Sequence, residues 1–182
     1  MRFALVPCLA LLMALFGTSA SVRAEDKPKP ADIEAPDTKP FDDAEFVMMA
    51  ASGGMLEVEL GKLATDQADM PDVKKFGKML VEDHTKANAE LMKIAKANKL
   101  ALPEKPMEKH QKECDRFKDL KGAEFDKAFV PFMIKDHEED IADFTKASKE
   151  AKNPELREFA SMCLPKLKEH LKMAKELGEK VK

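Results

Sequence analysis

Three histidines and one glutamate of this chain have the residue types and the spacing of a transition-metal site. The four residues are Glu57, His84, His137 and His170. Each falls on the apolar stripe of a long amphipathic segment, so all four side chains are expected to point into the protein interior. Imidazole nitrogens with one carboxylate suit iron, zinc, copper or manganese better than Ca²⁺ or Mg²⁺, which prefer oxygen ligands. We therefore predict a site for one transition-metal ion, with Fe, Zn or Cu as the candidates.

The same residues also allow an explanation without a metal. A single inward-facing histidine is more often hydrogen-bonded inside a core than bound to an ion, and Glu57 can form an ion pair with His84 alone. Burying charged groups is costly even when they are paired, so four such groups in one layer need a reason. Two hypotheses stay open: a metal-binding protein with a role in sequestration or stress protection, and a structural or interaction protein without metal or catalysis.

Several carboxylates lie close to these histidines in the sequence. Asp136 and Asp140 flank His137 and can orient its imidazole ring. The interpretation we favour places them at the solvated edge of the helices, together with Asp83 and Glu169. No Glu-x-x-His sequence occurs, which excludes the ligand motif that di-iron carboxylate bundles use twice. A full di-iron oxidase centre is therefore not expected.

Long helices must position the four residues. The 3.6-residue apolar period predicts four of them and one short helix, over about residues 42–68, 71–98, 107–120, 123–151 and 154–177. The first begins with Asp42 as N-cap and with Phe41 and Phe46 placed to form a hydrophobic staple. The remaining histidine, His110, falls among charged residues on the short helix and is assigned no role.

A repeat at a spacing of 83 residues relates the two halves of the helical region, pairing Ala64 with Ala147 and Pro71 with Pro154. It predicts two helical hairpins joined by the short helix, the plan of an all-α four-helix bundle with a long central connection. Both hairpin turns are expected to lie at the same end, and from there a rise of about 1.5 Å per residue places the four site residues within roughly 7–8 Å of bundle height.

Composition divides the chain into three parts. Residues 1–24 have a short basic start, an apolar stretch and small residues at a cleavage position, which is typical of a secretory signal peptide. Residues 25–40 are rich in proline and poor in apolar residues, and are expected to form a disordered linker. Residues 41–182 form the predicted helical domain. Export to the periplasm or out of the cell follows as an expectation.

The charges indicate a solvated surface. The formal net charge is −3, and basic and acidic residues alternate along the predicted helices, so nucleic acid is not an expected partner. No later stretch is apolar enough to span a membrane. Cys114 and Cys163 are predicted to lie far apart, as free and mostly buried thiols.

Four short stretches around these residues resemble one known family. They are Glu57–Ala64 (EVELGKLA), Asp83-His84, Asp136-His137 and Leu167–Leu171 (LKEHL). The family consists of exported, ferritin-like bundles catalogued as a domain of unknown function and often labelled predicted outer membrane proteins. The resemblance covers about residues 41–180 and implies a ferritin-like four-helix bundle of the bacterial envelope. It implies no established activity and no confirmed ligands.

Overall fold

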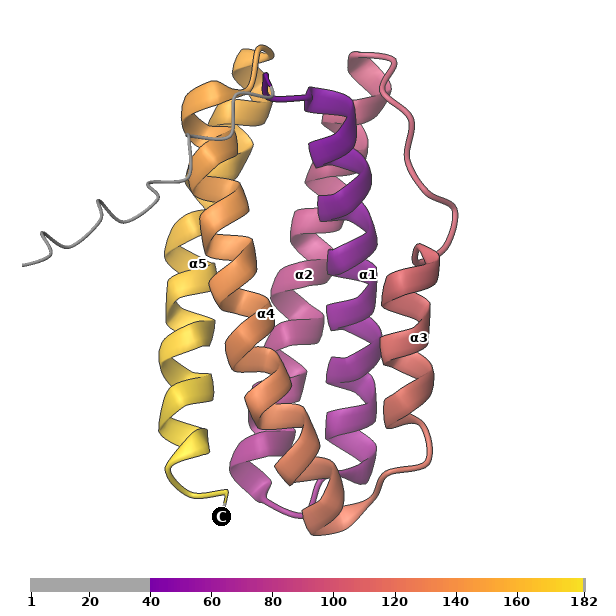
Figure 1. Cartoon of the computed structure of the whole chain (residues 1–182), viewed down its shortest axis with the longest axis vertical. Coiled ribbons are helices and arrows are strands. Elements are labelled where there is room, and N and C mark those ends of the chain that lie inside the picture. The colour runs from indigo at the N-terminus through magenta and orange to yellow at the C-terminus, as the bar shows by residue number, and fades with distance from the viewer. Residues whose placement is uncertain (1–39, 182) are drawn as a thin grey trace, which may run out of the picture. The chain divides into compact units, whose positions relative to one another are not determined.

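The computed structural model of the chain describes residues 40–181. The predicted signal peptide and almost all of the predicted linker lie outside the described residues. Five helices make up the described part: α1 (Asp43–Gln67), α2 (Pro71–Ala97), α3 (Glu108–Phe117), α4 (Gly122–Glu150) and α5 (Pro154–Gly178) (Figure 1). No strand is present in this range, so the expected all-α class is confirmed. None of the described helices is both long enough and apolar enough to cross a membrane.

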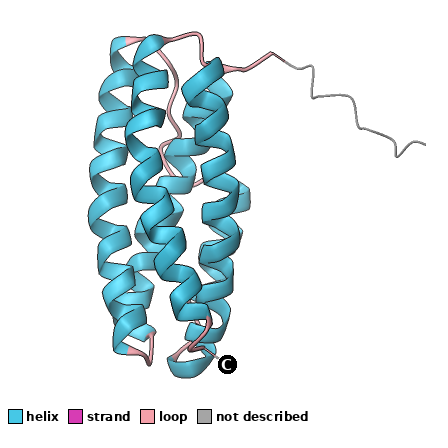
Figure 2. Ribbon diagram, turned by 90° about the vertical axis from the view of Figure 1, so that its left-hand side faces the viewer, coloured by secondary structure: helices cyan, strands magenta, loops and turns pink. Residues whose placement is uncertain are grey.

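The long helices pack as two hairpins. α1 lies along α2, and α4 lies along α5, while α2 and α5 form the main contact between the hairpins. The short helix α3 packs chiefly against α1. Figures 1 and 2 show the four long helices side by side along a common direction, with α3 outside them.

The two hairpin turns lie at opposite ends of the helices, so the expectation of a common end is wrong. Asp43 at the start of α1 accepts hydrogen bonds from the backbone of the second turn, at Lys152 (2.9 Å) and Asn153 (2.8 Å). Asp126 near the start of α4 accepts one from the first turn, at Met70 (2.9 Å). The segment containing α3 runs back along the helices before α4 begins (Figure 1). The sequence repeat locates each turn but carries no information about this reversal.

The first helix begins where the sequence predicts. The Asp42 carboxylate accepts hydrogen bonds from the backbone N–H groups of Ala44 (2.9 Å) and Glu45 (3.2 Å), which caps the helix. The Phe41 and Phe46 ring centroids lie 5.7 Å apart, in contact across the helix start. These contacts fix the direction in which α1 leaves the end of the domain.

Two glycines set the distance between α1 and α2. A Cβ atom added to Gly61 would lie 2.7 Å from the Gly77 carbonyl oxygen, and one added to Gly77 would lie 2.6 Å from that of Gly61. No larger residue fits at either position without moving a backbone. Glu57 lies one turn before Gly61, and His84 lies two turns after Gly77. The close approach of the two helices therefore holds Glu57 and His84 at similar heights along the bundle.

Two apolar clusters fill the interior, one toward each end of the helices. The first contains Leu60, Phe76, Phe117, Phe125, Phe129 and Met133, and the second contains Phe46, Leu91, Phe144, Leu156 and Phe159. The buried histidines and glutamate separate them. Cys114 is buried and Cys163 is half-buried, and both are free, as predicted.

Candidate metal centre

All four predicted site residues meet in one buried layer. Each long helix contributes one of them: Glu57 from α1, His84 from α2, His137 from α4 and His170 from α5. The reversed direction of α4 and α5 does not separate them, because each lies near the middle of its helix. Their exposed fractions are 1%, 7%, 0% and 1%, so all four are removed from solvent.

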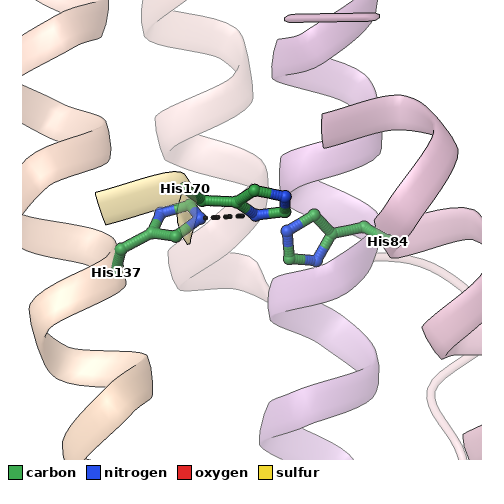
Figure 3. Close-up of side chains that lie close together, drawn as sticks. All are labelled: His84, His137 and His170. Carbon is green, nitrogen blue, oxygen red and sulfur yellow. Dashed lines mark hydrogen bonds between the residues drawn. The ribbon is translucent and has the colours of Figure 1, made fainter. Parts of the chain in front are cut away.

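The three imidazole rings converge on a small volume (Figure 3). One ring nitrogen from each of His84, His137 and His170 lies within 4.8 Å of the other two. Their ring centroids are 5.3 to 5.9 Å apart. Three nitrogen donors at such separations can all reach one ion at ordinary metal–nitrogen distances of about 2.0–2.1 Å after small side-chain shifts.

A separate acceptor contacts the outer nitrogen of each ring. His84 Nδ1 lies 2.7 Å from Glu57 Oε2. His137 Nδ1 donates to the Met133 carbonyl oxygen at 3.0 Å, and His170 Nε2 donates to Asp83 Oδ2 at 3.1 Å. Such contacts fix the orientation and the tautomer of metal-binding histidines.

These outer contacts determine what the inner nitrogens carry. The Met133 carbonyl and the Asp83 carboxylate only accept, so the N–H of each neutral ring is outside the layer and the inner nitrogen holds a lone pair. His137 Nε2 and His170 Nδ1 nevertheless face each other at 3.3 Å (dashed line in Figure 3). Without an added proton or a cation, this contact sets two lone pairs against each other.

Burial makes the added proton unfavourable. Burial, together with the smaller effects of His84 and His170, lowers the pKa of His137 to about 3. It lowers the pKa of His170 to about 4, and that of His84 to about 4. His84 Nε2 is buried and has no hydrogen-bond partner. At neutral pH the layer therefore presents uncharged imidazoles whose free lone pairs suit a metal ion.

Glu57 adds a carboxylate to this set. Its Oε2 contacts His84, while its Oε1 has no hydrogen-bond partner and lies 3.5 Å from His137 Nε2. Burial raises the pKa of Glu57 well above its usual value. An unpartnered buried carboxylate oxygen is unfavourable, and a cation in the layer would satisfy it.

Two carboxylates expected at the solvated edge contribute to the layer instead. Asp83 holds His170, and its side chain is only 18% exposed. The Asp136 side chain is 20% exposed, but its Oδ2 is buried, has no hydrogen-bond partner and lies 3.8 Å from His137 Nδ1. Asp83 acts on a residue of another helix, 87 positions away, so no local sequence pattern indicates its role.

His110 also has a contact that the sequence did not indicate. Its Nδ1 lies 2.6 Å from the Ser52 hydroxyl, which accepts a hydrogen bond from the Met107 backbone at 2.7 Å. This pair fastens the start of α3 to α1. His110 is thus part of a helix contact and lies outside the histidine triad.

A cavity of about 390 Å³ opens beside the layer on the α2–α5 side. Leu91, Phe144, Phe159 and Leu167 give it a mainly apolar lining, and Glu57, His84 and His170 of the layer also line it. Lys166 also lines it, with Nζ 3.6 Å from Asp83 Oδ2.

Fold and site together define an all-helical protein with a buried layer of histidines and carboxylates. The chain belongs to the family described as Domain of unknown function (DUF4142), which matches residues 27–177. No curated protein and no solved structure matches the chain.

Proposed function

We propose that the protein binds one transition-metal ion through His84, His137 and His170, with Glu57 as the fourth ligand. One observation carries this proposal: His137 Nε2 and His170 Nδ1 face each other at 3.3 Å while outer acceptors occupy the other nitrogen of each ring. A metal ion between the rings resolves the contact and uses both lone pairs.

The donor set favours Fe, Zn or Cu as the ion. Three imidazoles with one carboxylate match the borderline character of these metals, whereas Ca²⁺ and Mg²⁺ require mostly oxygen ligands. The Met133 side chain lies in the apolar cluster and its carbonyl oxygen orients His137, so a thioether ligand is not part of the proposal.

The proposed setting is a ferritin-like four-helix bundle exported to the periplasm or secreted. The signal-like residues 1–24 support export, and two packed hairpins joined by a long connection support the bundle plan. A buried single-ion site in such a protein suits metal sequestration or protection against metal stress.

Elemental analysis tests the site. Protein prepared without a metal-affinity tag is measured as isolated and after separate addition of Fe, Zn, Cu and Mn. We expect about one ion per chain, lost in the double variant His84→Ala/His170→Ala. His110→Ala is the matched control, because His110 lies outside the layer, and it should keep the ion. Absence of bound metal in all five samples would overturn the proposal.

A second candidate is a structural protein of the envelope without metal. The short Glu57–His84 and Asp83–His170 contacts favour it, because each pairs a carboxylate with an imidazole directly. This candidate predicts a stability that depends on pH through the histidines and does not change with chelators.

A further inference from the structure

We infer that the ion reaches the histidines through an outer position formed by Glu57, Asp136 and His137. This position lies on the α1–α4 side of the layer. The inference rests on the proposed function, and it adds the route by which the same site is filled and emptied.

The outer position has the properties of a cation site. One ligand atom from each of Glu57, Asp136 and His137 lies within 4.8 Å of the other two. Glu57 is 1% exposed and its Oε1 has no hydrogen-bond partner, and neither has the buried Oδ2 of Asp136. Buried polar atoms are normally satisfied, so two unpartnered carboxylate oxygens beside an imidazole indicate a missing positive partner.

One ion cannot occupy the outer position while another occupies the histidine position. His137 Nδ1 donates to the Met133 carbonyl, so only Nε2 retains a lone pair. That nitrogen lies 3.5 Å from Glu57 Oε1 and 3.3 Å from His170 Nδ1. Both positions require the same lone pair of His137. They are therefore alternative positions of a single ion.

Exposure and charge give the direction of travel. The side chain of Asp136 is 20% exposed, whereas those of Glu57 and His137 are 2% and 0% exposed, so an arriving ion meets Asp136 first. Asp136 also lines a small cavity with Glu139, Asp140 and Asp143, where Lys109 and His110 are the basic groups. An acidic lining raises the local concentration of cations.

The opposite side is less suited to an incoming cation. The larger cavity there has a mainly apolar lining, and its carboxylates (Glu57, Asp83, Glu90 and Asp140) share it with the positive charges of Lys86 and Lys166, the latter 3.6 Å from Asp83.

The rates of loading and release test the inference. Co²⁺ is the probe, because its visible absorption reports binding in stopped-flow mixing of the full chain, and EDTA then measures release. Asp136→Asn keeps the side-chain shape and removes the charge. We expect it to slow association and EDTA-driven release by a similar factor of about ten, with Kd changed less than threefold.

The matched control is Glu139→Gln. Glu139 lies on the same helix and lines the same cavity, but its side chain is 66% exposed and pairs with Lys135 at 3.5 Å. Its rates should stay within about twofold of those of the unmodified chain. Urea unfolding of both variants confirms that the domain is intact.

Each other outcome overturns the inference in a distinct way. Slower association with unchanged or faster release in Asp136→Asn would show a distant charge effect or a stationary ligand, because a transit position must affect both directions. Unchanged rates would place the route elsewhere and leave the histidine site standing. Absence of binding of Co²⁺ and of Fe, Zn, Cu and Mn by the unmodified chain would remove the proposed function itself.

Discussion

The buried carboxylates of this protein fall into two groups that differ in how completely they are satisfied. Asp126, at one end of the helices, is 2% exposed and accepts backbone hydrogen bonds from Asp69 (3.3 Å) and Met70 (2.9 Å) with separate oxygens. Glu57, in the middle, is 1% exposed but satisfies only one oxygen. The end residue fastens a turn, whereas the middle residue keeps an unused acceptor.

The same contrast extends to the chemistry of the partners. Asp126 is paired with backbone N–H groups that have no other use at the start of a helix. Glu57 is paired with a histidine whose second nitrogen is also unpartnered. The Asp126 contacts leave neither carboxylate oxygen without a partner, whereas the Glu57–His84 contact leaves lone pairs directed into the layer. The difference distinguishes a carboxylate that stabilises the fold from one that is free to bind the ion of the proposed function, and it yields predictions of unequal size.

The largest expected effect is stabilisation by the metal. A ligand that binds only the folded state at 100 times its Kd raises the free energy of unfolding by about 2.7 kcal/mol. We expect this increase with the preferred ion for the unmodified chain, and none for His84→Ala/His170→Ala. Chemical denaturation with and without the ion measures it. Asp126→Ala should retain the increase, since Asp126 is remote from the layer.

Removal of the Asp126 side chain should have the second-largest effect, a loss of stability. Asp126→Ala leaves two backbone donors of the α1–α2 turn without their acceptor, which we expect to cost about 2 kcal/mol of stability. Urea unfolding without metal measures the loss, and the metal stoichiometry should not change. Asp115→Ala, which removes an exposed carboxylate, is the control and should stay within about 0.5 kcal/mol. Loss of the bound ion in Asp126→Ala would contradict the distinction drawn between Asp126 at the end of the helices and Glu57 in the middle.

The stability of the metal-free protein should also depend on pH, with a smaller effect than the two above. The sign should be opposite for the buried histidine His137 and for Glu57. Burial lowers the pKa of His137 to about 3, below its value of about 6.5 in the unfolded chain. The unfolded state then binds a proton first as the pH falls below 6.5, so stability decreases by about 1.4 kcal/mol per pH unit for this residue. The raised pKa of Glu57 acts in the other direction, because the folded state holds its proton longer as the pH rises.

Unfolding measured from pH 6.5 to 5 tests this sign. His137→Asn should make the loss of stability shallower, because it removes one histidine that remains neutral in the folded state. An unchanged slope would mean that His137 is protonated in the fold. The His137–His170 contact would then be an ordinary hydrogen bond, and the main support for a metal would be lost.

The sequence allowed the helices and the inward-facing residues to be predicted because both follow from local periodicity. The 3.6-residue stripe identified Glu57, His84, His137 and His170, and all four are buried. Direction was not predictable in this way, since the placement of α4 depends on how residues 98–121 cross the domain (Figure 1). The four residues still meet in one layer, because a residue in the middle of a helix keeps its height along the bundle when the direction of the helix is reversed.

The contacts that orient the histidine rings could not be predicted from the sequence, for a different reason. Asp83 precedes a site histidine in the chain, yet it holds His170 on another helix and not its neighbour His84. Which carboxylate reaches which ring depends on helix rotation to within a fraction of a turn, and apolar periodicity does not define rotation that finely. Met133 contributes its carbonyl oxygen, a group that every residue has, so its side chain gave no signal.

Asp83→Asn gives the smallest expected effect and the finest test of the layer. Asparagine can still contact His170 but no longer offers a carboxylate, so the basicity and orientation of the ring are weakened. We expect metal affinity to fall about tenfold, at the lower end of the range for residues that orient metal-binding histidines. Stability without metal should change by less than about 0.5 kcal/mol, because the asparagine Oδ1 can still accept the hydrogen bond from His170 Nε2. Competition against a chromogenic chelator measures the affinity.

Glu169→Gln is the matched control for Asp83→Asn. Lys166 contacts both carboxylates, Glu169 at 3.1 Å and Asp83 at 3.6 Å, but Glu169 is 53% exposed and Asp83 alone contacts His170. Equal losses of affinity in the two variants would mean that the ion responds to net charge near Lys166. A loss confined to Asp83→Asn would mean that the imidazole must be held in one tautomer, which the inner lone pair of His170 requires.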